Sequence, residues 1–183
     1  MPMQDKPRIS VREMTLISLM TAILCIFGPF AIPLGAIPIS LTNFILFLLL
    51  YISGIRCTLI SYFLYLLLGA VGLPVFSGFS GGLTRLAGPT GGYLMGFIIL
   101  IFISGICICQ KKGFIFDIIG MILGMLFAYL CGTIWFCFQM KTTILYAMNV
   151  CVFPFLPGDA IKIFLAAKLG PSIKKRITKN KQL

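Results

Sequence analysis

Long stretches of apolar residues without any charge run through this chain. Residues 14–55 contain no Lys, Arg, Asp or Glu, and residues 57–84 contain none either. A membrane-spanning helix needs about 20 predominantly apolar residues, so the first stretch alone is long enough for two crossings. Of the 183 residues, 60% are hydrophobic and 10% are charged, whereas a soluble domain is about 45–50% apolar and about 25% charged. The sequence therefore predicts an all-α integral membrane protein.

Proline, glycine and charged residues divide these apolar stretches into six expected helices. The prolines and glycine within residues 29–38 separate a first helix at about 14–32 from a second at about 39–54, and Arg56 marks a tight turn. The other four helices are expected at about 59–71, about 92–109, about 115–136 and about 158–169. We therefore expect a compact bundle of six transmembrane helices over residues 14–170, between a basic leader at 1–13 and a basic tail at 171–183.

The positive charges predict the orientation of the bundle. The chain has 15 Lys and Arg but only four acidic residues, which gives a net charge of +11. Apart from Arg85, Lys141 and Lys162, the cations lie in the leader, at Arg56, after the fourth expected helix or near the C-terminal end. Cytoplasmic loops retain Lys and Arg, so both ends are expected in the cytoplasm. This bias explains the charge without nucleic acid, and the exposed cations are expected to attract anionic membrane lipid.

The segment at residues 72–92 is rich in glycine and too irregular for a membrane helix. It is either a flexible outer loop or an extracellular lid folded over a cavity, where glycine allows close backbone approach. Arg85 is either a solvated charge of this segment or the partner of a ligand carboxylate, which a guanidinium binds in bidentate fashion. Phe76, Phe79 and Tyr93 either serve packing or offer a surface on which an apolar ligand ring stacks.

Asp159 and Lys162 are the ionisable residues of the last expected helix. A charge inside a membrane segment costs about 2.5–3.5 kcal/mol on insertion scales and therefore indicates a function. Their i, i+3 spacing places the two side chains on one helix face. They form either a helix cap with an internal ion pair or the polar floor of a ligand site, in which Asp159 accepts hydrogen bonds and Lys162 donates them.

Ser18 and Ala22 form a small-xxx-small pair on the first expected helix. Such pairs let another helix approach closely. The contact is either internal packing or a docking face for a partner subunit.

No catalytic or metal-binding set of residues emerges from the sequence. It has no histidine, and its seven cysteines show no zinc-type spacing. An intramembrane aspartyl enzyme would need two facing carboxylates, and the glycine-rich segment has no GxxxxGK[ST] signature of a P-loop. We therefore expect neither an enzyme nor a metal or cofactor site, and any energy source would have to sit on another subunit.

Three stretches carry a resemblance to a known family. The first runs from Tyr65 to Phe76 as YLLLGAVGLPVF, the second combines Gly81-Gly82 with GPTGGYL at residues 88–94, and the third is PFLPGD at residues 154–159 with Lys162. In these stretches the chain resembles the BioY family, the biotin-capturing S components of energy-coupling-factor (ECF) transporters. The resemblance covers nearly the whole chain.

This resemblance implies high-affinity biotin capture and uptake by a multi-pass protein of a prokaryotic cell membrane. It implies that Asp159 and Lys162 lie in the biotin site and that the loop before the fourth helix is its lid. It also implies that Ser18 and Ala22 meet an EcfT-type membrane coupling subunit, which two cytoplasmic ATPase subunits drive. The sequence Thr42-Asn43-Phe44 departs from the Gln-Thr that precedes the phenylalanine in many relatives. The expected ligand-binding residues are Asn43, Phe76, Phe79, Arg85, Gly92, Tyr93, Asp159 and Lys162.

Biotin suits these residues chemically. Its ureido group needs donors and acceptors, which Asp159 and Lys162 supply, its fused ring suits aromatic side chains, and its carboxylate suits Arg85 or backbone N–H groups. The alternatives are an S component for another vitamin, an autonomous secondary transporter and an intramembrane enzyme. Secondary transporters commonly contain matching halves with broken helices, and the sequence has no convincing internal repeat.

Overall fold

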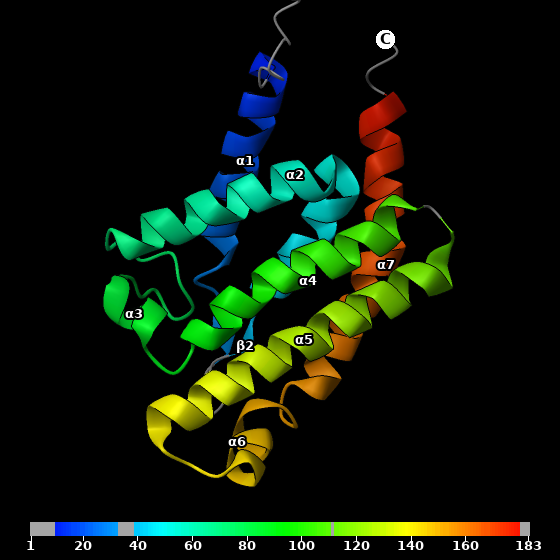
Figure 1. Ribbon diagram of the computed structural model, residues 1–183. Coiled ribbons are helices and arrows are strands. Elements are labelled where there is room, and N and C mark those ends of the chain that lie inside the picture. The colour runs from blue at the N-terminus through cyan, green and yellow to red at the C-terminus, as the bar shows by residue number, and fades with distance from the viewer. Residues whose placement is uncertain (1–9, 33–38, 111, 180–183) are drawn as a thin grey trace, which may run out of the picture.

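The computed structural model describes residues 10–32, 39–110 and 112–179 (Figure 1). Within these ranges the chain forms seven helices and one hairpin of two-residue strands, so the all-helical prediction is confirmed apart from the hairpin. The helices are α1 (Val11–Phe27), α2 (Thr42–Ala70), α3 (Leu83–Ala87), α4 (Gly91–Cys109), α5 (Phe114–Met140), α6 (Ile144–Cys151) and α7 (Leu156–Lys179), and the strands are β1 (Ala31–Ile32) and β2 (Ile39–Ser40).

The first helix, α1, ends earlier than the expected boundary at about 32. Glu13 supports its start by accepting a hydrogen bond from the backbone N–H of Ser10 (3.2 Å). It ends at Phe27: the Gly28 N–H still donates to the Leu24 carbonyl (2.8 Å), but Pro29 has no N–H with which to continue the helix. The chain then enters β1, which pairs antiparallel with β2 so that Ala31 faces Ser40.

The second and third expected helices form one kinked helix, α2. Arg56 does not make the expected turn, because the chain is helical there. The break lies instead at Gly54, with φ 74° and ψ −175°, a backbone conformation that is essentially restricted to glycine. The helix axis changes direction sharply at this kink (Figure 1). A turn was thus correctly expected near this position, but the glycine and not the charge produces it.

Helices α4 and α5 are antiparallel neighbours that pack through glycines (Figure 1). A methyl group on Gly96 would lie 2.9 Å from the Cα of Ala128, and one on Gly124 would lie 2.4 Å from the Ser104 hydroxyl. These small residues allow the backbones to approach closely, as in membrane helix pairs generally. The exposed side of α5 carries bulky apolar side chains, as expected for a surface that faces lipid: Ile115, Ile119, Ile122, Leu126, Leu130 and Ile134.

Helices α6 and α7 are joined across a bend of 51°. The last helix extends to Lys179, well beyond its expected end near Leu169 and despite Pro171 in its interior. Lys and Arg are good helix formers, which explains why the helix continues into the basic segment. The boundary expected at residue 170 therefore falls inside α7.

Among the described residues, three helices are long and apolar enough to cross a membrane: α2, α4 and α5. The bent pair of α6 and α7 gives a fourth when it is counted as one span. The core lies where α2, α4, α5 and α7 meet, and its largest fully buried side chains include Phe47, Tyr62, Tyr65 and Phe136.

Candidate ligand-binding site

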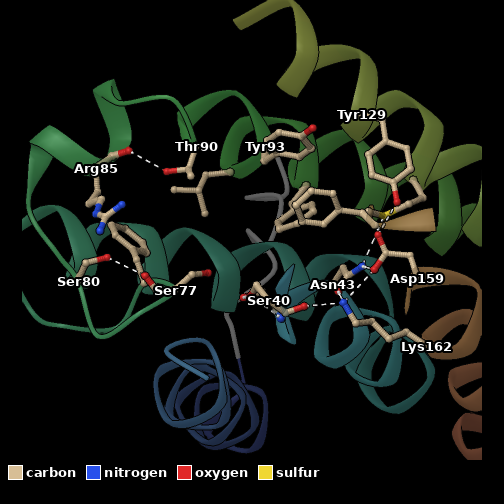
Figure 2. A pocket seen from close by; sticks show the side chains of 16 residues that line it. Ser40, Asn43, Ser77, Ser80, Arg85, Thr90, Tyr93, Tyr129, Asp159 and Lys162 are labelled. Carbon is tan, nitrogen blue, oxygen red and sulfur yellow. Dashed lines mark hydrogen bonds and ion pairs between the residues drawn. The ribbon is translucent and has the colours of Figure 1, made fainter. Parts of the chain in front are cut away.

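A cleft of about 660 Å³, including the solvent at its open side, lies between the first turns of α2, α4 and α7, the middle of α5 and the glycine-rich segment (Figure 2). The lining residues are Ser40, Thr42, Asn43, Phe76, Ser77, Ser80, Arg85, Thr90, Tyr93, Leu94, Phe97, Met125, Tyr129, Phe155, Asp159 and Lys162.

Four side chains from three helices form a polar cluster at one end of the cleft: Asn43, Tyr129, Asp159 and Lys162 (Figure 2). Asp159 is at its centre and only 3% exposed. Its Oδ1 accepts from Lys162 Nζ (2.9 Å) and from Asn43 Nδ2 (2.8 Å), while its Oδ2 accepts from the Tyr129 hydroxyl (2.5 Å). Asp159 follows Pro157-Gly158 in the first turn of α7, where the helix dipole favours a carboxylate.

Lys162 completes the cluster and connects it to the β hairpin. Besides Asp159, its Nζ donates to the Ser40 carbonyl (2.6 Å) and to Asn43 Oδ1 (3.3 Å). The three ammonium protons therefore each have an acceptor. A buried ion pair is tolerated when its remaining hydrogen-bonding capacity is satisfied in this way.

The cluster keeps acceptor capacity for a ligand. A carboxylate offers about four lone-pair positions, and protein donors occupy three of those on Asp159, two at Oδ1 and one at Oδ2. The Tyr129 hydroxyl oxygen can accept as well, since the contact with Asp159 uses only its proton. The cluster therefore suits a ligand group that presents N–H donors.

Aromatic side chains form the wall next to the polar cluster. The rings of Tyr93 and Tyr129 lie 6.4 Å apart with an interplanar angle of 79°, an edge-to-face arrangement. The Tyr93 hydroxyl is engaged with the backbone, since it donates to the Cys151 carbonyl (2.6 Å). Phe76 and Phe97 add further apolar surface.

Arg85 lies at the other end of the cleft, on the short helix α3 of the glycine-rich segment (Figure 2). Its side chain is exposed, and its carbonyl accepts from the hydroxyl of Thr90 (3.5 Å). The cleft therefore has a buried acid–amine pair at one end and a solvated guanidinium at the other. This separation suits an elongated molecule with a polar head and an anionic tail.

The structure brings six of the eight expected ligand-binding residues to the lining of the cleft but not Phe79 and Gly92. Phe79 is 63% exposed, and its ring contacts that of Phe30. Gly92 serves helix packing, because a methyl group there would lie 2.3 Å from Trp135 Cβ.

The expectations missed much of the lining. Tyr129 is the main omission, because a tyrosine in an apolar helix has the same pattern as a packing residue. The available signal was a polar hydroxyl group within a stretch of α5 that contains no charged residue. The other residues that were missed are Ser40, Thr42, Ser77, Ser80, Thr90, Leu94, Phe97, Met125 and Phe155.

Ser18 and Ala22 lie on the exposed side of α1. The contact between α1 and α2 uses Thr21 instead, which is buried and donates to the Ser61 carbonyl (3.3 Å). Internal packing therefore does not account for the small-residue pair.

No group of three or more His, Cys, Asp or Glu side chains in the described ranges is placed to hold a metal ion. The cysteines, all of which fall within those ranges, are free thiols.

Comparisons with known proteins agree on one family. The model of the BioY family matches residues 3–179. The chain is 35% identical over 165 residues to the biotin transporter BioY of Thermotoga maritima, and the aligned region covers 90% of this chain and 97% of that protein. It is 32% identical over 171 residues to the biotin transporter BioY2 of Lactococcus lactis, and the aligned region covers 91% of this chain and 92% of that protein.

A solved structure has the same fold. The crystal structure of the S-component for biotin from an ECF-type ABC transporter superposes with a TM-score of 0.82 at 29% identity, covering 93% of this chain and 94% of that one. The match with the family model, the identity to full-length relatives and the shared fold together show that this chain belongs to the BioY family.

Proposed function

We propose that this chain captures biotin at the outer face of a prokaryotic cell membrane, as the S component of an ECF-type importer. The observation that carries the proposal is the cleft with the polar cluster at one end and Arg85 at the other. Relatives over nearly the full length are biotin transporters, which supports the same ligand here.

The chemistry of biotin matches this arrangement. The ureido N–H groups donate to the free position on Asp159 Oδ2 and to the Tyr129 hydroxyl oxygen, and the ureido carbonyl accepts from Lys162 in exchange for one of its present contacts. The fused rings lie against Tyr93 and the neighbouring phenylalanines. The carboxylate at the end of the aliphatic chain pairs with Arg85, whose guanidinium favours bidentate contacts.

We assign the chain six membrane crossings with both ends in the cytoplasm. The crossings are α1, the two parts of α2 on either side of Gly54, α4, α5 and the bent pair of α6 and α7. Helices α1 and α7, which carry the chain ends, project from the same end of the bundle (Figure 1), and the basic residues concentrate near those ends. The glycine-rich segment then lies outside as the lid.

The importer requires partner subunits. We place the EcfT-type coupling subunit on the exposed side of α1 at Ser18 and Ala22, where small side chains let a helix approach closely. Two cytoplasmic ATPase subunits supply the energy, since the sequence has no P-loop of its own. The chain itself acts as a receptor and not as an enzyme.

A matched pair of lysine variants on α7 tests the proposal. In lipid nanodiscs, Lys162→Ala is expected to lower biotin affinity by roughly 10- to 150-fold, because it removes a hydrogen bond from a charged donor to the ligand, which is worth about 1.5–3 kcal/mol. Lys168→Ala, an exposed control on the same helix, is expected to bind like the wild type. Equal biotin affinity of the two variants would refute the proposed site.

A further inference from the structure

The glycine-rich segment contains a tight turn whose two ends have different surroundings. Phe76 and Ser80 pair across the turn in an isolated antiparallel bridge, with Phe76 N–H donating to the Ser80 carbonyl (2.9 Å). Both residues line the cleft. The tip of the turn, Gly78-Phe79, points away from the cleft and contacts Pro29 and Phe30, which follow α1.

Two contacts attach this tip to the residues that follow α1. The Gly78 N–H donates to the Pro29 carbonyl (2.9 Å). The Phe79 ring meets the Phe30 ring edge-on, with centroids 5.7 Å apart and an interplanar angle of 72°. Both rings are more than half exposed, so burial in the core does not explain their contact.

Phe79 makes this contact at a conformational cost. Its φ of 54° is in the left-handed region, which residues other than Gly, Asn and Asp rarely adopt. Glycine flanks the position on one side at Gly78, and a glycine at 79 itself would avoid the cost. A strained non-glycine residue persists only when its surroundings determine it, and Phe30 is the neighbour that its ring contacts.

The same short segment also leads to the polar cluster. Phe30 directly precedes β1, in which Ala31 pairs with Ser40 of β2. The Ser40 carbonyl accepts the short hydrogen bond from Lys162 Nζ (2.6 Å). Pro29 and Phe30 are thus linked to the lid through the turn and to the opposite end of the cleft through the hairpin.

We infer that Phe30 and Phe79 are positioning residues that clasp the lid to the end of α1, so that the position of α1 sets closure of the cleft. Displacement of the end of α1 withdraws Phe76 and Ser80 from one side of the cleft and Ser40 from the other. The inference rests on the proposed function, since it concerns retention of the ligand captured there.

Biotin dissociation from the full chain in lipid nanodiscs tests the clasp. Phe79→Ala and Phe30→Ala are each expected to speed release of radiolabelled biotin roughly 2- to 10-fold, the range that an edge-to-face ring pair supports. The double variant is expected to be no faster than the faster single variant, because each substitution already removes the Phe30–Phe79 contact. Phe79→Tyr keeps the ring and is expected to release biotin at the wild-type rate, as is Phe63→Ala, a control for an exposed phenylalanine on α2.

Phe79→Gly separates the ring contact from backbone strain. It removes the ring and relieves the strain at φ 54°, and it is expected to release biotin as fast as Phe79→Ala. Slow release from Phe79→Gly, wild-type rates in both alanine variants, or additive effects in the double variant would each overturn the clasp. If the wild-type chain does not bind biotin, the proposed function fails instead, so the two failures are distinguishable.

Discussion

Removing one charge of the Asp159–Lys162 pair is expected to destabilise the chain more than removing both. The two residues are only 3% and 8% exposed, and their charged atoms lie 2.9 Å apart. Either substitution alone leaves an uncompensated buried charge, which typically costs about 3–5 kcal/mol. Asp159 keeps Asn43 and Tyr129 as donors, and Lys162 keeps the Ser40 carbonyl as an acceptor. The cost is therefore expected near the lower end, about 3 kcal/mol for Asp159→Asn or Lys162→Met.

Replacing both residues removes the uncompensated charge. The free energy of unfolding of the double variant Asp159→Asn/Lys162→Met is expected to lie within about 1 kcal/mol of the wild-type value, since replacing a buried ion pair by neutral residues often costs little stability. For a chain of 150–250 residues, 1 kcal/mol shifts the unfolding midpoint by about 2–4 °C. The single variants should therefore unfold about 6–12 °C below the wild type, and the double variant within about 4 °C of it.

Thermal unfolding in lipid nanodiscs, followed by intrinsic fluorescence, measures these midpoints, and biotin titration of the same samples measures binding. The double variant is expected to be folded and unable to bind biotin. Lys168→Met provides the control for an exposed lysine on α7. A double variant whose midpoint falls by the sum of the two single shifts would refute the pairing argument, and one that still binds biotin tightly would refute the role of the pair in recognition.

Three other predictions concern helix packing, the ligand carboxylate and the partner surface. Gly92→Ala is expected to lower the free energy of unfolding by about 1–3 kcal/mol, because the added methyl group would meet Trp135 Cβ. Gly158→Ala is the control, since the space around Gly158 is open, and it should change the unfolding midpoint by a few degrees at most. Equal unfolding midpoints for the two variants would contradict this prediction. Arg85→Ala should weaken biotin about 3- to 5-fold, as for an exposed ion pair, and leave binding of biotin methyl ester unchanged; an equal loss for both ligands would place the carboxylate elsewhere. Ser18→Leu should leave biotin binding intact and abolish uptake by cells that contain the ATPase and coupling subunits, and normal uptake would exclude this docking face.

The sequence was most informative where a residue type is unusual for the segment in which it lies. Asp159 and Lys162 stand out because charge in a membrane helix is costly, and the structure places both in the polar cluster. Tyr129 does not stand out, because the chain has 17 Phe and 6 Tyr, and most of these pack or face lipid. Its role depends on which side of α5 faces α7, which is a tertiary property. The Ser40 carbonyl is a backbone group, so no residue type could indicate it.

Helix boundaries were less predictable for a related reason. Arg56 suggested a turn because charge is expected at the ends of membrane helices, yet the kink is at Gly54, where only the backbone conformation reveals it. The basic residues after Leu169 suggested that the last helix ends there, although Lys and Arg favour helix as much as leucine does. Phe79 lies in the expected lid but turns away from the cleft, because its backbone conformation directs the ring toward Phe30.

Titration of the purified wild-type chain in lipid nanodiscs with biotin, thiamine and riboflavin tests the central claim most directly. The acid–amine pair and the distant guanidinium predict saturable binding of biotin, competition by unlabelled biotin, and no binding of the other two vitamins at the same concentrations. Saturable binding of thiamine or riboflavin without biotin binding would contradict the account.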